Sequence, residues 1–410
     1  MEFSVPSSAY VHIPFCRRRC FYCDFPISVV GDKRNGTNSG TIGQYVQVLC
    51  DEIRLTENLG QPLKTVFFGG GTPSLLSVNQ LSQILDVLDQ QFGILPNAEV
   101  SMEIDPGTFD LTQIKGYRSS GINRVSLGVQ AFQSELLTAC GRTHYVEDVY
   151  ESIELIHQAG ISNFSLDLIS GLPNQTIAQW QDSLDKTIAL SPNHISVYDL
   201  TIEPMTAFGK RYQPGLTPLP TDEATALMYR MAQQILTFAG YEHYEISNYA
   251  QPGFQCQHNR VYWKNQSFYG FGMGATSYVS GDRVAHPRKT REYYDWVQKK
   301  MPGGISTSQN IPDSADILLD TLMVGLRLAE GLSLSELSQQ FSQAKLAQVL
   351  TCLQPYQQSG WIEVLNCDRQ PILINSHLPI EGQIRLTDPE GFLFSNVILL
   401  KLFEKFDRNV

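Results

Sequence analysis

The sequence predicts an α/β fold with a mainly parallel sheet, followed by a smaller and mainly helical domain. Three observations support this class. Short apolar, β-rich runs alternate about six times with segments of helical periodicity. These runs are apolar almost throughout, which is typical of parallel strands covered by helices. The chain also has 410 residues, enough for two domains, and its last part changes to a mainly helical pattern.

Six runs have the length and composition of strands, and each ends in, or is directly followed by, proline or a polar residue. They are SAYVHI at 8–13, KTVFFGGGTP at 64–73, EVSMEIDP at 99–106, RVSLGVQ at 124–130, NFSLDLISGLP at 163–173 and HISVYDLTIEP at 194–204.

Segments between these runs show the spacing of amphipathic helices. In QLSQILDVLDQQF at 80–92, the apolar residues Leu81, Ile84, Leu85 and Leu88 fall on one helical face. VEDVYESIELIHQAG at 146–160 has the same spacing and stops at a glycine, and TIAQWQDSLDKTIAL at 176–190 follows the next strand. Spacing alone fits either a parallel barrel or a doubly wound sheet.

The C-terminal part reads as a separate module. Residues 279–310 are rich in turn formers, and we expect them to connect a domain at 1–278 to one at 311–410. ADILLDTLMVGLRLAEGLS predicts a helix that stops at Gly331. Two more helices and a small β element follow, which suggests a winged-helix-like domain. It carries little positive charge, so docking or covering the first domain is expected of it rather than DNA binding.

The composition excludes several classes of protein. The net charge of −11 argues against a nucleic-acid-binding protein, because such proteins usually carry a basic surface. No run approaches the ~20 apolar residues of a membrane-spanning helix. The first residues, MEFSVPSSAY, lack the basic and apolar regions of a secretion signal. We therefore expect a cytoplasmic protein without a nucleic-acid partner.

Three of the eight cysteines are clustered in HIPFCRRRCFYCDF, at Cys16, Cys20 and Cys23. Thiolates suit zinc, copper(I) or iron–sulfur clusters. A structural zinc site usually has four ligands, and no fourth one follows at the usual spacing. An iron–sulfur cube with three protein ligands leaves one iron open to a substrate or cofactor. The scattered cysteines, by contrast, are expected to be small core residues.

The CxxxCxxC spacing resembles the signature of the radical S-adenosylmethionine (SAM) family. The resemblance covers the chain from about Tyr10 to Tyr278. It implies a partial (β/α)6 barrel with a [4Fe–4S] cluster on Cys16, Cys20 and Cys23. In that family the open iron binds SAM, and one electron cleaves SAM to a radical. An electron donor such as ferredoxin or flavodoxin is therefore an expected partner.

Polar residues lie at the ends of the predicted strands, where the chemistry of parallel barrels is found. Taken singly, each could cap a helix or form a salt bridge. The glycine run after the second strand offers amides that could donate to an anion or a carbonyl. The resemblance implies that SAM contacts Tyr10, Gly70, Gly71, Thr72, Glu103, Gln130, Arg142 and Asp167.

The sequences YVHIPFC and CFYCDF resemble the branch of oxygen-independent coproporphyrinogen III oxidases and heme chaperones. The oxidases have a further cysteine where this chain has Phe25, and a longer segment before the cluster. The HNxxYW element at 258–263 resembles the chaperones. The predicted function is therefore binding heme and transferring it to acceptor hemoproteins, membrane-associated ones among them. Oxidative decarboxylation of coproporphyrinogen III, or another radical SAM reaction, stays open.

The HNxxYW element supplies the candidate heme contacts. The imidazole of His258 could ligate heme iron, and Cys256 is a second candidate ligand. Tyr262 and Trp263 offer flat apolar faces. We expect this segment close to the barrel mouth, although the same residues could instead fill the core. The basic run at 17–19 could meet heme propionates or an electron donor, or belong to a solvated loop.

Overall fold

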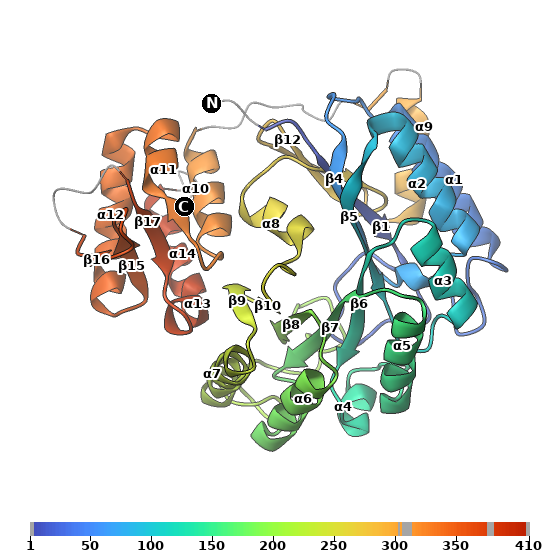
Figure 1. The fold of residues 1–410 in the computed structure, drawn as a ribbon, viewed down its shortest axis with the longest axis horizontal. Coiled ribbons are helices and arrows are strands. Elements are labelled where there is room, and N and C mark those ends of the chain that lie inside the picture. Colours follow the sequence, from blue (N-terminus) through green and yellow to red (C-terminus); the bar gives the residue numbers. More distant parts are fainter. Residues whose placement is uncertain (1–3, 302–303, 306–313, 375–380, 407–410) are drawn as a thin grey trace.

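The computed structural model describes residues 4–301, 304–305, 314–374 and 381–406 (Figure 1). Its centre is a sheet with the strand order β11-β1-β4-β5-β6-β7-β8-β10-β9. The six predicted strands are consecutive neighbours in this sheet and run parallel. They are β1 (Ser8–Ile13), β4 (Leu63–Gly70), β5 (Ile94–Ile104), β6 (Arg124–Gln130), β7 (Asn163–Ser170) and β8 (His194–Asp199).

A helix follows each of these strands and crosses back to the next one. The helices are α1 (Gly40–Leu55), α2 (Val78–Phe92), α3 (Leu111–Ser119), α5 (Val146–Gln158), α6 (Ile177–Ala189) and α7 (Asp222–Phe238). Ser77 caps α2 and Thr176 caps α6, each accepting a hydrogen bond from the third residue of its helix. The short helix α4 (Ser134–Ala139) precedes α5.

The strand order distinguishes a barrel from a doubly wound sheet. In a doubly wound sheet the order reverses near the middle, whereas here the six strands follow one another in chain order. The edge strands are β11 (Tyr269–Phe271) and β9 (Glu242–Glu245), and β10 (Asn248–Ala250) lies between β8 and β9. Among the described residues β11 and β9 are not paired, so the barrel is open. The predicted partial (β/α)6 barrel is confirmed.

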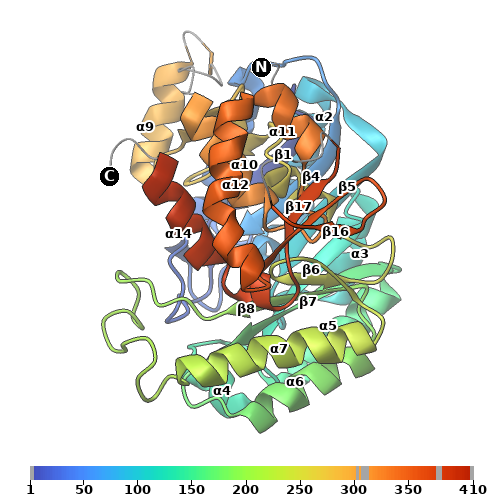
Figure 2. The same ribbon diagram turned by 90° about the vertical axis from the view of Figure 1, so that its left-hand side faces the viewer.

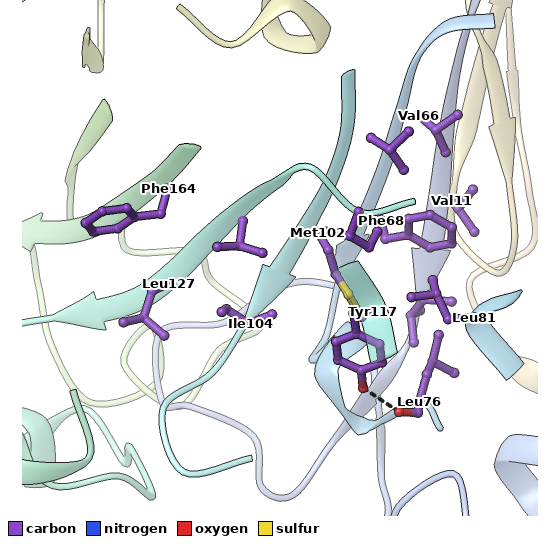
Figure 3. Close-up of a cluster of buried hydrophobic side chains, with 14 of the residues drawn as sticks. Val11, Val66, Phe68, Leu76, Leu81, Met102, Ile104, Tyr117, Leu127 and Phe164 are labelled. Atoms are coloured by element: carbon purple, nitrogen blue, oxygen red, sulfur yellow. Dashed lines mark hydrogen bonds between the residues drawn. The ribbon is translucent and has the colours of Figure 1, made fainter. Parts of the chain in front are cut away.

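The main core lies between the sheet and the helices that cover it. Val66, Phe68 and Met102 point from the strands toward α2 and α3 and are buried (Figure 3). Tyr117 of α3 is also fully buried, and its hydroxyl donates to the carbonyl of Leu76 at 2.5 Å. This packing holds the carboxyl ends of the strands in place.

The C-terminal part forms its own core around a small antiparallel sheet, β14-β17-β15-β16. Its helices face the viewer in Figure 2. The elements are α10 (Ser314–Gly325), β14 (Leu332–Ser333), α11 (Leu334–Gln340), α12 (Gln343–Gln358), β15 (Ile362–Leu365), β16 (Pro371–Ile372), β17 (Gln383–Leu386), α13 (Glu390–Leu393) and α14 (Ser395–Phe406).

The predicted end of the first C-terminal helix is wrong. The helix stops at Gly325 rather than Gly331. Beyond it, the chain pairs with the barrel: the amide of Ile246 donates to the carbonyl of Arg327, and that of Ala329 to the carbonyl of Tyr244. Tertiary pairing therefore replaces the last helical turns that the apolar spacing predicted.

Residues 276–300 are ordered elements rather than turns alone. They form the hairpin β12 (Thr276–Val279) and β13 (Asp282–Ala285), then helix α9 (Thr290–Lys300). Tyr293 and Val297 of α9 belong to the core of the barrel. The rest of the expected connection lies partly outside the described residues, and the division into domains stays a prediction. No helix in the described part of the chain has both the length and the apolar character needed to cross a bilayer.

Candidate functional site

A pocket of about 620 Å³ opens at the carboxyl ends of the barrel strands. Its wall consists of the strand ends on one side and the cysteine loop, residues 16–27, on the other. Most predicted site residues line it: Cys16, Cys20, Cys23, Gly70, Gly71, Thr72, Glu103, Gln130, Arg142 and Asp167. Tyr10 does not line it, because its hydroxyl lies against the ring of His12, 3.0 Å from Nδ1.

The three clustered cysteines are partly exposed, reduced and open to this pocket. Cys16 ends the short strand β2 (Phe15–Cys16), which pairs with β3 (Ser28–Val29). The hydroxyl of Thr72 lies 3.7 Å from the sulfur of Cys16, and the guanidinium of Arg142 lies 3.6 Å from the sulfur of Cys20. Both are donors, which favour thiolates as ligands.

Burial acts against the thiolate at Cys16. It raises the pKa of Cys16 to about 12, with a further contribution from Asp105. A thiolate here therefore needs a strong positive partner, such as the iron of a cluster. In the part of the chain that the structure describes, no three His, Cys, Asp or Glu side chains are grouped closely enough for a single metal ion.

The arginines between the cysteines hold the loop in place. Arg19 donates to the carbonyls of Cys23, Phe25 and Ile27 at 3.1, 3.1 and 3.3 Å. Arg17 donates to the carbonyl of Gly107 at 2.9 Å, although its Nε is buried without a partner. Arg18 pairs with Asp32 at the surface. This set of contacts makes the loop a defined turn around the three thiols.

The glycine run at the end of β4 is required by close packing. Gly70 has a φ of +112°, and a Cβ there would lie 2.4 Å from the ring of His12. The expectation of free amides is wrong. The amides of Gly70, Gly71 and Thr72 donate to the side chain of Glu103 and to the carbonyls of Ile13 and Phe15. At Gly70 and Gly71 the segment therefore presents backbone without side chains to the pocket.

Two carboxylates project into the pocket from β5 and β7. Burial and the neighbouring Asp167 raise the pKa of Glu103 to about 8, and the amide of Gly70 opposes this shift. Burial also raises the pKa of Asp167, although the hydroxyl of Ser126 donates to both its oxygens at 2.9 and 3.0 Å. Such groups can accept from an ammonium group or from ribose hydroxyls.

Arg142 is anchored by a carboxylate that the sequence did not single out. Its guanidinium pairs with Asp105 at 2.7 Å and donates to the carbonyl of Gly128 at 3.0 Å. Its side chain is 8% exposed, and its Nε has no partner. Asp105 also accepts from the hydroxyl of Thr72 at 3.0 Å. Asp105 therefore links the glycine segment, the arginine and the cysteine loop.

Gln130 reaches the pocket through a distorted strand end. Its φ is +68°, and the pairing of β6 with β7 shifts register between Gly128 and Gln130. A bulge of this kind turns a side chain away from the regular alternation of the strand. Gln130 lines the pocket, and this local irregularity of the strand explains how its side chain reaches it.

The HNxxYW element lies at the other end of the barrel, so its expected place near the mouth is wrong. It forms helix α8 (Gln257–Trp263), which Figure 1 shows between the sheet and the C-terminal helices. The carboxylate of Glu99 accepts from the amides of Gln257 and His258, each at 3.1 Å. Glu99 pairs in register with Thr65, near the start of β4. The amino-terminal ends of the strands therefore hold this helix.

His258 is fully buried, and both its ring nitrogens have partners. Nδ1 lies 2.6 Å from the hydroxyl of Thr65, and Nε2 lies 2.8 Å from that of Tyr262. Burial, assisted by Arg124, lowers the pKa of His258 to about 3. Cys256 is also fully buried. In this arrangement neither candidate iron ligand is open to a bound molecule.

Comparison with known proteins identifies the chain. The radical SAM superfamily domain matches residues 10–187, and the HemN C-terminal domain matches residues 313–366. The heme chaperone HemW of Synechocystis is 47% identical over 406 residues, covering 99% of this chain and 98% of that protein. The chain belongs to the HemW family of heme chaperones. Membership of the radical SAM superfamily implies a [4Fe–4S] cluster and SAM.

Other HemW proteins agree with this assignment. HemW of Lactococcus lactis is 35% identical, covering 82% of this chain and 85% of that protein. HemW of Escherichia coli is 36% identical, covering 79% and 83%. The solved structure of the coproporphyrinogen III oxidase HemN from Escherichia coli has a TM-score of 0.79 at 24% identity, covering 99% of this chain and 91% of that chain. That likeness supports the fold alone.

The pocket contains residues that sequence reasoning missed. Asp105, Ser126, Tyr198, Asp199 and Arg288 line it beside the predicted ones. Asp105 and Asp199 each stand at the end of a predicted strand, so position was an available signal. Arg288 lies in the expected connection, and its guanidinium donates to the carbonyl of Asp24 at 2.8 Å. Nothing local in the sequence indicates that contact.

Proposed function

We propose that this HemW-family protein binds heme and transfers it to acceptor hemoproteins. The observation that carries the proposal is the 47% identity to the heme chaperone HemW of Synechocystis over nearly the whole of both chains. The HNxxYW element and Phe25 in the cysteine loop support it from the sequence. Acceptors include membrane-associated hemoproteins, and a ferredoxin or flavodoxin is the proposed electron donor.

The cluster site of the proposal uses Cys16, Cys20 and Cys23. Their thiols open to one pocket, and donors from Thr72 and Arg142 lie beside two of the sulfurs. The cluster would supply electrons and one open iron when bound. The residues present fit such a group, since three partly exposed thiols stand at the edge of a pocket lined with carboxylates.

The pocket also fits SAM by its charge and hydrogen-bonding groups. Glu103 and Asp167 would accept from the ammonium group and ribose hydroxyls, and the guanidinium of Arg142 would attract the carboxylate. Gly70, Gly71, Thr72 and Gln130 complete the wall. Tyr10 would act indirectly, by fixing the ring of His12 behind Gly70.

Heme contact by Cys256, His258, Tyr262 and Trp263 stays a proposal. Because both nitrogens of His258 are already bonded, iron ligation by this ring requires α8 to shift away from Thr65. The outer side of α8 meets the C-terminal domain, where Arg260 pairs with Glu330 at 2.7 Å. A shift of α8 would therefore involve that contact as well.

The test is a heme-transfer assay with the full chain after anaerobic cluster reconstitution. The protein is loaded with heme, separated from free heme and mixed with an apo-hemoprotein whose holo spectrum is known. We expect heme to reach the apo-hemoprotein faster from this protein than from serum albumin loaded with heme. Failure to bind heme, or transfer no faster than from albumin, contradicts the proposal.

A second candidate, oxidative decarboxylation of coproporphyrinogen III, is favoured by the match to the HemN C-terminal domain over residues 313–366. The same reconstituted protein is incubated with coproporphyrinogen III, SAM and a reductant. We expect no protoporphyrinogen by chromatography. Product above a cluster-free control would replace the chaperone proposal with the enzyme.

A further inference from the structure

A row of hydrogen bonds crosses the inside of the barrel, from the pocket to the start of α8. Ser165 Oγ lies 3.3 Å from Asp167 Oδ1 and 2.8 Å from His194 Nδ1. His194 Nε2 lies 2.9 Å from Tyr244 Oη. Tyr244 Oη in turn lies 3.3 Å from the backbone nitrogen of Cys256. Every member between the two ends is buried.

The direction of each hydrogen bond follows from the two ends. The amide of Cys256 can only donate, so the oxygen of Tyr244 accepts there and its hydroxyl proton is free to go to His194 Nε2. His194 then carries its own proton on Nδ1 and donates to Ser165. The hydroxyl of Ser165 is left to donate to Asp167, which can only accept when ionised.

A neutral imidazole suits this arrangement, since the ring must accept at one nitrogen and donate at the other. Burial holds the pKa of His194 well below its ordinary value, and the neighbouring guanidinium of Arg124 acts in the same direction. His194 is therefore neutral at physiological pH, and the row of bonds permits a single tautomer.

We propose that His194 is a positioning residue for Asp167: acting through Ser165 and oriented by Tyr244, it holds the pocket carboxylate in one orientation and ties it to Cys256, the N-cap of α8. The inference rests on the proposed role of Asp167 in binding SAM. It gives the HNxxYW helix a function at the pocket although the two lie at opposite ends of the barrel.

Other groups around Asp167 limit the size of the effect. Ser126 on β6 and Ser196 on β8 also donate to its carboxylate. The charged groups that face it are Glu103 from β5 and Arg124 from β6. Loss of the Ser165 bond therefore makes the ionised form of the Asp167 carboxylate less stable and raises its pKa further. The other donors to this carboxylate remain. We expect about 10-fold weaker SAM binding, which corresponds to ~1.4 kcal/mol.

The experiment compares Tyr244→Phe and Ser165→Ala with the control Tyr249→Phe. The hydroxyl of Tyr249 is also buried, but it has no partner in the structure. Each reconstituted variant is titrated with SAM at several pH values around neutrality. Tyr244→Phe and Ser165→Ala should bind about 10-fold more weakly at neutral pH and recover as the pH rises. Tyr249→Phe should follow the parent at every pH.

A second measurement does not depend on SAM. Nitrogen-15 spectra of histidine-labelled protein should show His194 protonated on Nδ1 in the parent, and a changed tautomer balance in Tyr244→Phe. The inference is overturned if His194 carries its proton on Nε2, or if the three variants bind SAM alike. If the parent binds no SAM, the proposed SAM site itself fails, while the tautomer still reports whether the row of bonds exists.

Discussion

At the scale of single residues, the pocket depends on side chains whose neighbours alter their chemistry. Burial raises the pKa of the Cys16 thiol, and burial together with Asp167 raises the pKa of Glu103 to about 8. Such perturbed groups gather where a charged ligand is to be bound. Placing these groups in the pocket therefore lowers the stability of the protein and strengthens its binding of a charged ligand, and both effects can be measured.

The clustered cysteines give a first prediction. Replacing Cys16, Cys20 or Cys23 by Ala should abolish bound iron and the broad visible absorption of an iron–sulfur cluster, because each cube corner needs its thiolate. Cys367→Ala, at an exposed position, is the control and should keep the iron. Iron analysis and spectra after reconstitution make the comparison. Retention of a full cluster in the triple variant would exclude this site.

Glu103 gives a second prediction, on pH and stability. Its pKa is about 8 in the folded protein, against 4.5 ordinarily. Between these values the folded state holds more protons than the unfolded state, so Glu103 lowers the free energy of unfolding as the pH rises. Glu103→Gln should equal the parent in stability near the lower of these pH values and exceed it at pH 8 by ~3–5 kcal/mol. It should also weaken SAM binding.

Thermal melts of the cluster-free protein across this pH range measure the difference between Glu103→Gln and the parent. Glu404→Gln, at an exposed position, serves as the control and should show no pH-dependent difference. A parent and variant whose melting temperatures differ by the same amount at every pH would refute the assignment of the raised pKa to Glu103.

At the scale of elements, helix α8 joins the barrel interior to the C-terminal domain. On its inner side His258 bonds to Thr65, and its first amides bond to Glu99. On its outer side the guanidinium of Arg327 lies over the ring of Trp263, 5.6 Å from its centroid. This seven-residue helix has contacts on both sides, and it closes the amino-terminal end of the barrel.

His258→Ala tests this closure. Removing a fully buried ring leaves a cavity and two unpaired hydroxyls, so the free energy of unfolding should fall by ~2–4 kcal/mol without heme present. His157→Ala, on the exposed side of α5, should change it by less than ~0.5 kcal/mol. Chemical denaturation of both variants gives the values. Unchanged stability in His258→Ala together with an altered heme spectrum would instead favour the ligand role.

At the scale of the whole molecule, the C-terminal domain is held to the barrel by charged contacts around β9 and α7. His243 Nδ1 donates to Asp388 at 2.8 Å, and the His243 side chain is 1% exposed. Arg230 makes two bonds with Glu390, at 2.6 and 2.9 Å. The two hydrophobic cores are thus joined by a polar interface, and Tyr229 of α7 belongs to the C-terminal core.

Asp388→Ala tests the strength of this interface. It leaves the buried His243 Nδ1 without a partner, so we expect a loss of ~1–3 kcal/mol in the free energy of unfolding. Lys401→Ala removes one partner of an exposed ion pair and should cost less than ~1 kcal/mol. Equal shifts in urea denaturation of the two variants would show that the contact contributes no more than a surface pair.

Much of the fold was readable because it rests on local patterns. The six strands and the helices α2, α5 and α6 follow from periodicity and from caps encoded a few residues away. The end of α10 was misread, since apolar spacing continues past Gly325 while the backbone turns to pair with the barrel. Local propensity contains no information about such a partner.

By itself, the sequence determined the alternation of strands and helices, the three thiols and the polar residues at strand ends. These depend on spacing within one segment, and parallel strands bring their ends together whatever the details. Only the tertiary structure decided that α8 closes the opposite end of the barrel, that Asp105 holds Arg142, and that Ser165, His194 and Tyr244 form one row. Those contacts join residues far apart in the chain, and their geometry depends on the packing of the whole sheet.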